Sequence, residues 1–459
     1  MQVIQDACVI PMVGSERLPH HDVLIEGSEI VAVQPTGDAV PESSTVVDGR
    51  DRYVIPGLID THVHFWEAEK LRPHGLDATR LNGAWLDLCL VNGVTTVLCL
   101  HGYPEVLAIR DRVAAGELAG PTVHSSGPIL NDADLTYEGA RAEVAREVSA
   151  GYEFVKVYNE LSTEAYRGIV EAAVEHELRV LGHVPRAPGL AGVLASGQVS
   201  IVHAEEILYT AFDFRVGAGQ RDWVHAPPLN VAELPRICAS IRDAGITMMP
   251  CISAFYAIWQ QAENPSWWLG GFPEFSLLPQ ALLDTWTQPG YDNYVERFAD
   301  HASRRNLLEG YWFQVQLIDA LRAAGVPMTA STDVRIPGTS PGLLHVELAN
   351  LAVAGLGDEG ALRAATVNGG ELLEPGTRLG VIGPGSRADL VLLLADPLRD
   401  IRNAKRIDGV MTRGHWHSRA DLDARMERLS TLWDGDVRTP READKRRLSA
   451  PSKLTCPPA

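Results

Sequence analysis

Two histidines separated by a single residue, His62 and His64, stand in the segment VIPGLIDTHVHFW. The segment resembles a β-strand, and side chains alternate between the two faces of a strand, so both imidazoles project to the same side. Asp60 shares that side. Histidine is the commonest metal ligand, so the pair suits a metal ion. A hydrogen-bonded pair of core histidines would explain the spacing equally well, and the pattern alone leaves both interpretations open.

Four further residues favour the metal interpretation. Lys156 lies in EFVKVY, His183 in VLGHV, His203 in SIVHAEE and Asp333 in MTASTDV, each at or near the end of a different predicted strand. A lysine inside an apolar strand is costly unless something neutralises or pairs it. The competing explanations are a buried ion pair for Lys156, structural roles for the two histidines and a helix N-cap for Asp333.

This set of side chains suits one kind of chemistry. Four imidazoles and a carboxylate are ligands for zinc or a similar first-row ion. A lysine ammonium cannot bind a metal, but the carbamate formed when Lys156 adds carbon dioxide presents two oxygens and could bridge two ions. Two neighbouring ions can hold a hydroxide between them while one polarises a substrate carbonyl. The set therefore predicts a binuclear hydrolytic centre.

Eight short apolar runs position these residues, and amphipathic helical patterns separate most of them. TEAYRGIVEAAVEHE opens with a helix start signal, and FQVQLIDALRAAG ends on Gly325. This alternation predicts an α/β fold, a (β/α)₈ TIM barrel with catalytic groups at the C-terminal ends of its strands. The predicted strands are residues 58–65, 94–100, 122–125, 154–158, 179–183, 200–203, 246–251 and 326–333.

The segments outside the barrel read as strands at both ends of the chain. We expect residues 1–56 and 381–420 to form one small β-sandwich domain, and residues 57–380 to form the barrel. Residues 421–459 are expected to form a C-terminal helix and a mobile, charged and Pro-rich tail. Insertions near 208–229 and 254–294 are longer than a barrel loop requires, which is typical of lids and binding loops.

The second insertion is rich in aromatic side chains, and two interpretations stay open. The rings could pack the insertion onto the barrel, or they could form a hydrophobic lid over a bulky apolar or aromatic substrate. Trp267 and Trp268 are the candidate substrate contacts in the second case. The aromatic residues are Phe255, Tyr256, Trp259, Trp267, Trp268, Phe272, Phe275 and Trp286.

The formal net charge of −19 argues against a broad basic surface for nucleic acid or anionic lipid. No two cysteines have C-x-x-C spacing, and Cys251, with three others, is interpreted as a small core residue. The first residues lack the pattern of a signal peptide, and no apolar run has transmembrane length. We expect a cytoplasmic homo-oligomer that acts on a small-molecule substrate, with no nucleic-acid or membrane partner.

From about residue 20 to about residue 415, the chain resembles the amidohydrolase superfamily. It is most similar there to the imidazolonepropionase-like and Xaa-Pro dipeptidase-like group with a lysine on the fourth strand. The segments that carry the resemblance are VIPGLIDTHVHF, GVTTVLCL, EFVKVY, LGHVP, IVHAEE, STDV, LRAATVNGGELL and LGVIGPGSRADLVLLLADPL.

The resemblance implies a role for each residue of the set. His62, His64 and Asp333 would bind the more buried ion, and His183 and His203 the second ion. Lys156, as N6-carboxylysine, would bridge the two ions. Asp333 would also take a proton from the bridging hydroxide and hand it to the leaving amine, which fits general acid–base logic.

Two departures from the common pattern of the family bear on the substrate. Residues 367–370 read Val-Asn-Gly-Gly where the family often has Asn-Ala-Ala, and the second strand runs into His101. His101 could contact substrate, although a solvated loop histidine fits as well. Tyr158, two residues past Lys156 on the same strand face, is a candidate for contacting a substrate carbonyl or carboxylate.

These observations predict a metal-dependent amidohydrolase that cleaves an amide of the peptide or N-acyl amino acid type. It would use two divalent ions, with zinc ranked before manganese and cobalt. The alternatives are hydrolysis of a lactone, carbamate or organophosphate at the same centre, a deaminase or cyclic amidase, and a non-catalytic binding protein. Lys156 argues against a mononuclear deaminase, and the complete ligand set argues against a binding protein.

Overall fold

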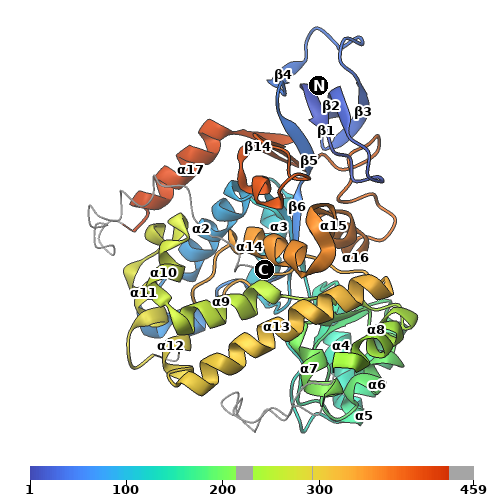
Figure 1. Cartoon of the computed structure of the whole chain (residues 1–459), viewed down its shortest axis with the longest axis vertical. Helices are drawn as coiled ribbons and strands as arrows, with labels where there is room; N and C mark the ends of the chain where they lie inside the picture. The colour runs from blue at the N-terminus through green and yellow to red at the C-terminus, as the bar shows by residue number, and fades with distance from the viewer. Residues whose placement is uncertain (213–230, 292, 434–459) are drawn as a thin grey trace.

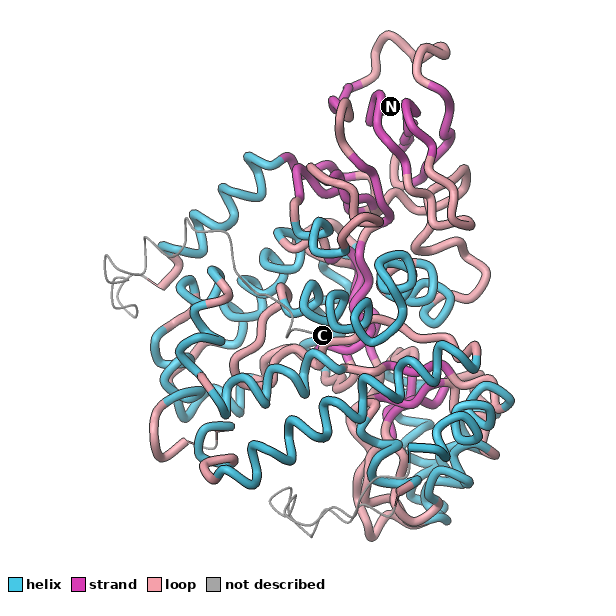
Figure 2. Tube along the Cα trace, viewed as in Figure 1, coloured by secondary structure: helices cyan, strands magenta, loops and turns pink. Residues whose placement is uncertain are grey.

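The computed structural model describes residues 1–212, 231–291 and 293–433. A barrel surrounded by helices forms the main body, and a sheet built from both ends of the chain projects from one end of it (Figure 1). Figure 2 shows these two groups of strands separately, one beside the N-terminus and one enclosed by helices. The predicted fold class, a TIM barrel with a small β domain from both chain ends, is confirmed.

The β domain joins the two ends of the chain through backbone pairing. Its strand order is β15-β14-β13-β5-β1-β2-β3, with β4 parallel to β1. Strand β13 runs antiparallel to β5, where Leu390 pairs with Pro56, so the last part of the chain extends the first. The strands are β1 (Gln2–Val9), β2 (Leu18–Glu26), β3 (Glu29–Pro35), β4 (Thr45–Asp48), β5 (Tyr53–Pro56), β13 (Leu390–Leu393), β14 (Ile407–Thr412) and β15 (His415–Ser418).

The barrel consists of seven regular strands and one irregular segment. Strands β6, β7 and β8 form one parallel sheet, and β9 to β12 form another. A bridge between Ser126 and Phe154 joins the two sheets. The strands are β6 (Leu58–Val63), β7 (Val94–Cys99), β8 (Thr122–Ser125), β9 (Phe154–Val157), β10 (Arg179–Gly182), β11 (Ser200–Val202) and β12 (Thr247–Met249).

Residues 328–334 close the barrel, but they do not form the regular eighth strand that the sequence predicts. Isolated bridges link Met328 to β12 and Val334 to β6. Between them, side chains replace part of the backbone ladder. The N–H of Thr332 donates to the carboxylate of Asp60. The hydroxyl of Ser331 accepts from the backbone N–H of Cys251, which lies two residues past the end of β12. The segment therefore completes the barrel while leaving its backbone irregular beside the predicted site.

Helices follow most strands and cover the outside of the barrel. Both helices predicted from start or stop signals are present. Ser162 caps the N-terminus of α5, and Gly325, with φ 78°, ends α13, which begins earlier than the sequence suggested. The helices of this layer are α2 (Ala78–Val91), α3 (Pro104–Ala114), α4 (Tyr137–Ala150), α5 (Thr163–Glu175), α6 (Gly189–Leu194), α7 (Glu205–Ala211), α8 (Leu234–Asp243), α13 (His301–Ala324), α14 (Leu343–Leu351), α15 (Gly357–Ala364) and α16 (Val367–Leu373).

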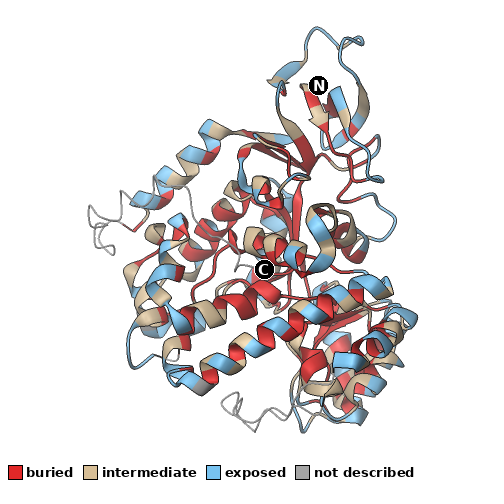
Figure 3. Ribbon diagram, in the orientation of Figure 1, coloured by how far each residue is buried: buried red, intermediate tan, exposed pale blue. Residues whose placement is uncertain are grey.

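The second insertion is helical and its aromatic rings pack in the interior. Trp268 is fully buried, and it contacts Tyr256 and Phe272 at ring-centroid distances of 6.0 and 4.9 Å. Figure 3 shows the inner faces of these helices buried, with the exposed residues on their outer sides. The elements are α9 (Ile252–Glu263), α10 (Pro265–Gly270), the 3₁₀ turn Pro273–Leu277, α11 (Gln280–Thr287) and α12 (Tyr294–Arg297).

Parts of two predictions lie outside the described residues. Most of the insertion predicted near 208–229 falls on 213–230, and the predicted tail falls on 434–459. The C-terminal helix is α17 (Arg419–Thr431), which Ser418 and Asp421 cap reciprocally. In the described part of the chain, no helix is both long enough and apolar enough to cross a membrane.

Gly182, the last residue of β10, permits the close approach of β10 to β9. Its φ is +143°, and a Cβ added there would collide with the carbonyl oxygen of Val157. We expect Gly182→Ala to lower the free energy of unfolding by more than the roughly 1–2 kcal/mol cost of a left-handed residue alone. Gly197→Ala is the matched control, since Gly197 also has positive φ but no atom lies within 4 Å of where its Cβ would be. Urea denaturation of both variants measures the difference, and equal losses would contradict the packing argument.

Candidate metal centre

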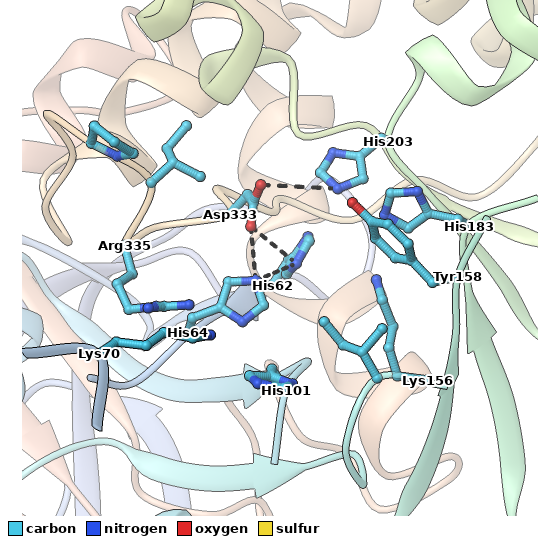
Figure 4. A pocket seen from close by; sticks show the side chains of 13 residues that line it. His62, His64, Lys70, His101, Lys156, Tyr158, His183, His203, Asp333 and Arg335 are labelled. Carbon is cyan, nitrogen blue, oxygen red and sulfur yellow. Dashed lines mark hydrogen bonds and ion pairs between the residues drawn. The ribbon is translucent and has the colours of Figure 1, made fainter. Parts of the chain in front are cut away.

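A cavity of about 450 Å³ opens at the C-terminal ends of the barrel strands, and it brings together the residues that the sequence singles out. All six predicted ligands line it, as do Tyr158 and His101 (Figure 4). The lining residues are His62, His64, Lys70, His101, Ile129, Lys156, Tyr158, His183, His203, Asp333, Arg335, Ile336 and Pro337.

Three potential ligand atoms form a small triangle in this cavity. The Nε2 atoms of His62 and His64 lie 3.1 Å apart, and the Oδ1 atom of Asp333 lies 3.2 Å from the first and 2.9 Å from the second. Tetrahedral zinc with nitrogen ligands at about 2.0–2.1 Å would hold its ligand atoms about 3.3 Å apart. The spacing therefore fits a single ion bound between the three side chains.

The barrel itself fixes this triangle. Asp60, on β6, accepts hydrogen bonds from the backbone N–H groups of His62 and Thr332, each at 3.1 Å. Its other oxygen accepts from the hydroxyl of Thr332 at 2.6 Å. The N–H of Asp333 donates in turn to the carbonyl of His62. Asp60 thus locks the strand that carries the two histidines to the segment that carries Asp333.

Left-handed backbone occurs at three successive strand ends around the cavity. His203 has φ 71°, Cys251 has φ 51° and Asp333 has φ 54°. Non-glycine residues rarely adopt this conformation, and its strain of order 1–3 kcal/mol persists where the surrounding structure enforces it. Such strain clusters at functional sites, and here it turns the side chains at the strand ends toward the cavity.

Burial keeps the imidazoles neutral and therefore able to bind a metal. It lowers the pKa of His203 to about 3 and also lowers the pKa values of His62 and His64, more than the neighbouring carboxylate raises them. Burial raises the pKa of Asp333, but the imidazoles and the hydrogen bond with His64 hold it below its usual range. The cluster is thus a carboxylate among neutral imidazoles, which is the protonation state that metal binding requires.

Two further polar atoms in the cavity lack hydrogen-bond partners. The Nζ of Lys156 and the Nε2 of His183 are buried and unpaired among the described residues. Burial lowers the pKa of Lys156 to about 8, partly opposed by Asp333. Unpaired buried polar atoms are costly in a folded protein and call for an explanation such as a bound ion or ligand. These two atoms lie where the sequence predicts the bridging lysine and the second ion.

Glu206, at the start of α7, orients His183. Its Oε1 lies 3.0 Å from the Nδ1 of His183, and its Oε2 accepts from the guanidinium of Arg186 at 2.6 Å. Burial raises the pKa of Glu206, but His183 and Arg186 together lower it to about 2. With Nδ1 held by a carboxylate, Nε2 of His183 is left to face the cavity, an arrangement common among metal-bound histidines.

Cys251 is part of the site, although its apolar sequence context indicates a core residue. Its sulfur lies 3.3 Å from the Nδ1 of His62 and donates to the hydroxyl of Ser331. Burial raises the pKa of the thiol, so it stays protonated. Ser331 and the carbonyl of Met249 are both acceptors for the thiol proton, so the sulfur is free to accept from the Nδ1–H tautomer of His62, in which the Nε2 lone pair faces the cavity. No local sequence signal indicates this contact, because Cys251 and His62 are far apart in the chain.

The two predicted tryptophans do not reach the cavity. Trp268 is buried and donates from its indole N–H to the carbonyl of Gly338, and Trp267 is 40% exposed. The packing interpretation of the insertion is therefore the one that the structure supports. Sequence reasoning also missed Arg335, Ile336 and Pro337, which line the cavity directly after Asp333. Their position just past a predicted strand end was the available signal.

The chain is similar in sequence and in structure to several known proteins. The profile of the Amidohydrolase family matches residues 313–417. Imidazolonepropionase from Chromobacterium violaceum is 26% identical over 433 residues, which cover 82% of this chain and 85% of that protein. The structure of a putative prolidase from Bifidobacterium longum superposes with a TM-score of 0.67 at 22% identity, covering 93% of this chain and 98% of that one.

A third relative matches over a shorter stretch. Adenine deaminase from Chelativorans sp. is 29% identical over 202 residues. The alignment covers 42% of this chain and 34% of the deaminase, so the chain matches about a third of the length of that relative. The full-length similarity to imidazolonepropionase is the broader of the two.

The ion pairs of Glu206 predict a pH-dependent contribution to stability. The carboxyl has a pKa of about 2 in the folded protein against 4.5 for an ordinary glutamate, so its ionised form stabilises the fold above pH 4.5 and loses effect toward pH 2. We expect Glu206→Gln to lower the free energy of unfolding of metal-free protein by roughly 1–3 kcal/mol at pH 7. The difference from wild type should shrink between pH 4.5 and 3.5. Urea titrations at these pH values measure the difference in free energy of unfolding. A difference that does not change with pH would show that the ionisation of Glu206 does not contribute to stability.

The thiol of Cys251 predicts a specific effect on metal affinity. Cys251→Val keeps a similar volume but removes the acceptor for His62, so we expect zinc affinity to fall about 10- to 100-fold, as for other hydrogen-bond partners of ligands. Cys251→Ser, which retains a donor and an acceptor, should stay within a few-fold of wild type. Competition with a chromophoric chelator measures both affinities. Wild-type affinity in Cys251→Val would show that the contact does not orient His62.

Proposed function

Since the chain belongs to the amidohydrolase family, as its sequence predicts, we propose that it is a metal-dependent hydrolase that cleaves an amide C–N bond of a small molecule. The observation that carries this proposal is the triangle of His62 Nε2, His64 Nε2 and Asp333 Oδ1, with spacings of 2.9–3.2 Å. The Nζ of Lys156, in the lining of the same cavity, is buried and has no hydrogen-bond partner among the described residues.

We assign the ligands of two divalent ions to this cavity. His62, His64 and Asp333 bind the first ion, and His183 and His203 bind the second. The imidazole rings of His62 and His203 lie 5.0 Å apart, and those of His183 and His203 lie 4.8 Å apart, so the two groups of ligands are continuous. Nitrogen and carboxylate donors in this number suit zinc, with manganese and cobalt as alternatives.

Lys156 joins the two groups as N6-carboxylysine in this proposal. Carbon dioxide adds to a neutral amine, and burial lowers the pKa of Lys156 to about 8, so a substantial neutral fraction exists near neutral pH. The resulting carbamate would exchange a buried positive charge for a negative one among groups that bind cations. This exchange would remove the cost of an unpaired ammonium in the barrel.

The bound ions would polarise the substrate carbonyl and acidify the attacking water. Asp333 is placed to accept the proton of that water and to pass it to the departing amine, because its carboxylate faces the centre of the cavity and is held in the ionised form. The phenol of Tyr158 lies against His183, with a ring-centroid distance of 3.8 Å. Burial raises the pKa of Tyr158, so its hydroxyl keeps its proton and can donate to a substrate carbonyl or carboxylate.

The remaining lining favours a substrate of the peptide or N-acyl amino acid type with an apolar group. Ile129, Ile336 and Pro337 add apolar side chains to a cavity lining that is otherwise mostly polar. The full-length relative named imidazolonepropionase supports a C–N bond as the target. A lactone, carbamate or organophosphate could react at the same centre, and a substrate screen separates these possibilities. Homo-oligomerisation and a cytoplasmic location stay predictions.

Lys156→Met tests the binuclear centre, because methionine fills a similar volume without a chargeable nitrogen. We expect the wild type, reconstituted with zinc in bicarbonate buffer, to hold close to two ions per chain and the variant to hold one or none. Amide hydrolysis should fall at least about 100-fold, while the metal-free variant should be no less stable, since a buried amine has been removed. Metal analysis and urea denaturation measure these effects.

Two results would overturn this assignment. An active Lys156→Met enzyme with one ion would exclude the bridging carbamate. Incorporation of ¹³C-labelled bicarbonate into the wild type but not into the variant would support it. A screen of peptides, N-acyl amino acids, lactones, carbamates and organophosphates tests the bond type. Activity confined to oxygen esters would exclude the amidase.

A further inference from the structure

A second group of polar side chains lies on the His64 side of the cavity, where Lys70, His101 and Arg335 line it and Glu67 lies behind them. Glu67, Lys70, His101 and Arg335, named here the Glu67 cluster, meet at one carboxylate oxygen. The Oε1 of Glu67 lies 2.6 Å from the Nζ of Lys70, 3.4 Å from the Nε2 of His101 and 3.8 Å from the Nη2 of Arg335. Figure 4 shows Lys70 and Arg335 beside His64, across the cavity from Tyr158 and His183.

The Glu67 cluster carries more positive than negative charge. Lys70 and Arg335 contribute two positive charges, and Glu67 contributes one negative charge. Burial lowers the pKa of His101 to about 4, although Glu67 opposes this, so the imidazole is neutral at pH 7. Counted over these four side chains, the cluster therefore carries one net positive charge, and of its two cations Arg335 is shielded from water while Lys70 is exposed.

Arg335 is the member of the cluster whose position is most strongly enforced. Its side chain is 19% exposed, and its Nε is buried without a hydrogen-bond partner among the described residues. Its backbone has φ 100°, a conformation that costs energy for a residue with a side chain. The hydroxyl of Thr339 accepts from its backbone N–H at 3.2 Å, which holds the turn that directs Arg335.

The wall next to Arg335 is apolar. Ile336 and Pro337 follow it directly in the lining, and the insertion helices hold this turn from behind. Gln261 donates to the carbonyl of Pro337 at 2.8 Å, and Trp268 donates to that of Gly338 at 2.7 Å. The cavity thus presents an apolar strip that ends at a fixed guanidinium with donor capacity to spare.

We propose that the Glu67 cluster is the binding site for a carboxylate of the substrate, with Arg335 as the principal contact and Lys70 as the second. A guanidinium pairs with a carboxylate through directional hydrogen bonds, and the net positive charge of the cluster favours an anion over a neutral group. This inference rests on the proposed function, and it narrows the substrate class to amides that bear a free carboxylate on an apolar skeleton.

Binding of a matched pair of ligands tests the inference without any reaction. Isothermal calorimetry on the zinc-reconstituted full chain would compare 4-phenylbutyrate with 4-phenylbutan-1-ol, which have the same apolar skeleton. We expect the carboxylate to bind more tightly to wild type. Arg335→Gln should weaken its binding about 10- to 100-fold, the range for a lost hydrogen bond to a charged group, without changing that of the alcohol.

Three further variants separate a specific role from general damage. Arg335→Lys should retain much of the preference, because a cation remains, and Lys70→Gln should weaken carboxylate binding to a smaller extent. Arg322→Gln removes an exposed arginine of α13 that pairs with Asp319, and it should alter neither ligand. Wild-type affinity of Arg335→Gln for phenylbutyrate would overturn the proposal, since the carboxylate would then bind elsewhere, for example on the metal ions.

Kinetics separates failure of this inference from failure of the proposed function. For N-acyl amino acids and their C-terminal carboxamides, we expect wild type to prefer the acids in kcat/KM, mainly through KM, and Arg335→Gln to lose this preference. Equal hydrolysis of both by wild type would overturn the inference and leave the amidohydrolase standing. Arg335-dependent binding of phenylbutyrate without hydrolysis of any amide would support the anion site and refute the proposed function.

Discussion

The Nε2 atoms of two neutral imidazoles, His62 and His64, and a carboxylate oxygen of Asp333 lie about 3 Å from one another inside the barrel. Much of the surrounding structure holds these three atoms in place. His64 and Asp333 are 269 positions apart in the chain, so only closure of the barrel brings them together. Asp60 holds the barrel closed beside the cavity, because it accepts hydrogen bonds from the backbone of β6 at His62 and from the closing segment at Thr332. Three polar atoms that face one another in a buried place are costly to desolvate, and the hydrogen bond between His64 and Asp333 offsets part of that cost. A cation between them turns that cost into binding energy.

The direction of each imidazole depends on what its other nitrogen contacts. The Nδ1 of His62 faces the sulfur of Cys251, and the Nδ1 of His183 faces the carboxylate of Glu206. These partners come from different parts of the barrel, and one is a neutral thiol while the other is an ion. Nevertheless they have the same effect, because both leave Nε2 facing the cavity. Control of the tautomers is therefore spread over the fold, although the ligands themselves follow a simple sequence pattern.

The sequence predicts the parts of this protein that depend on local periodicity. Alternation along β6 and the residue after it puts His62 and His64 on one side, and strand ends locate Lys156 and His183, so the six candidate ligands in the cavity lining are foreseeable. Features that depend on contacts between distant segments cannot be predicted in this way. The irregular segment that replaces the eighth strand arises because side chains take over its backbone hydrogen bonds. The partnership of Cys251 with His62 likewise appears only after the barrel closes.

The aromatic insertion shows why composition is a poor guide to what a cavity binds. Its rings pack against one another, and Trp268 reaches the site only through the backbone carbonyl of Gly338. Gln261 acts in the same way on Pro337, and a Cβ at Gly338 would collide with the side chain of Gln261. The insertion therefore holds the turn that carries Arg335, and none of its described residues is part of the cavity lining. Variation in such an insertion would change specificity by moving the turn, while the ligands on the barrel strands stay fixed.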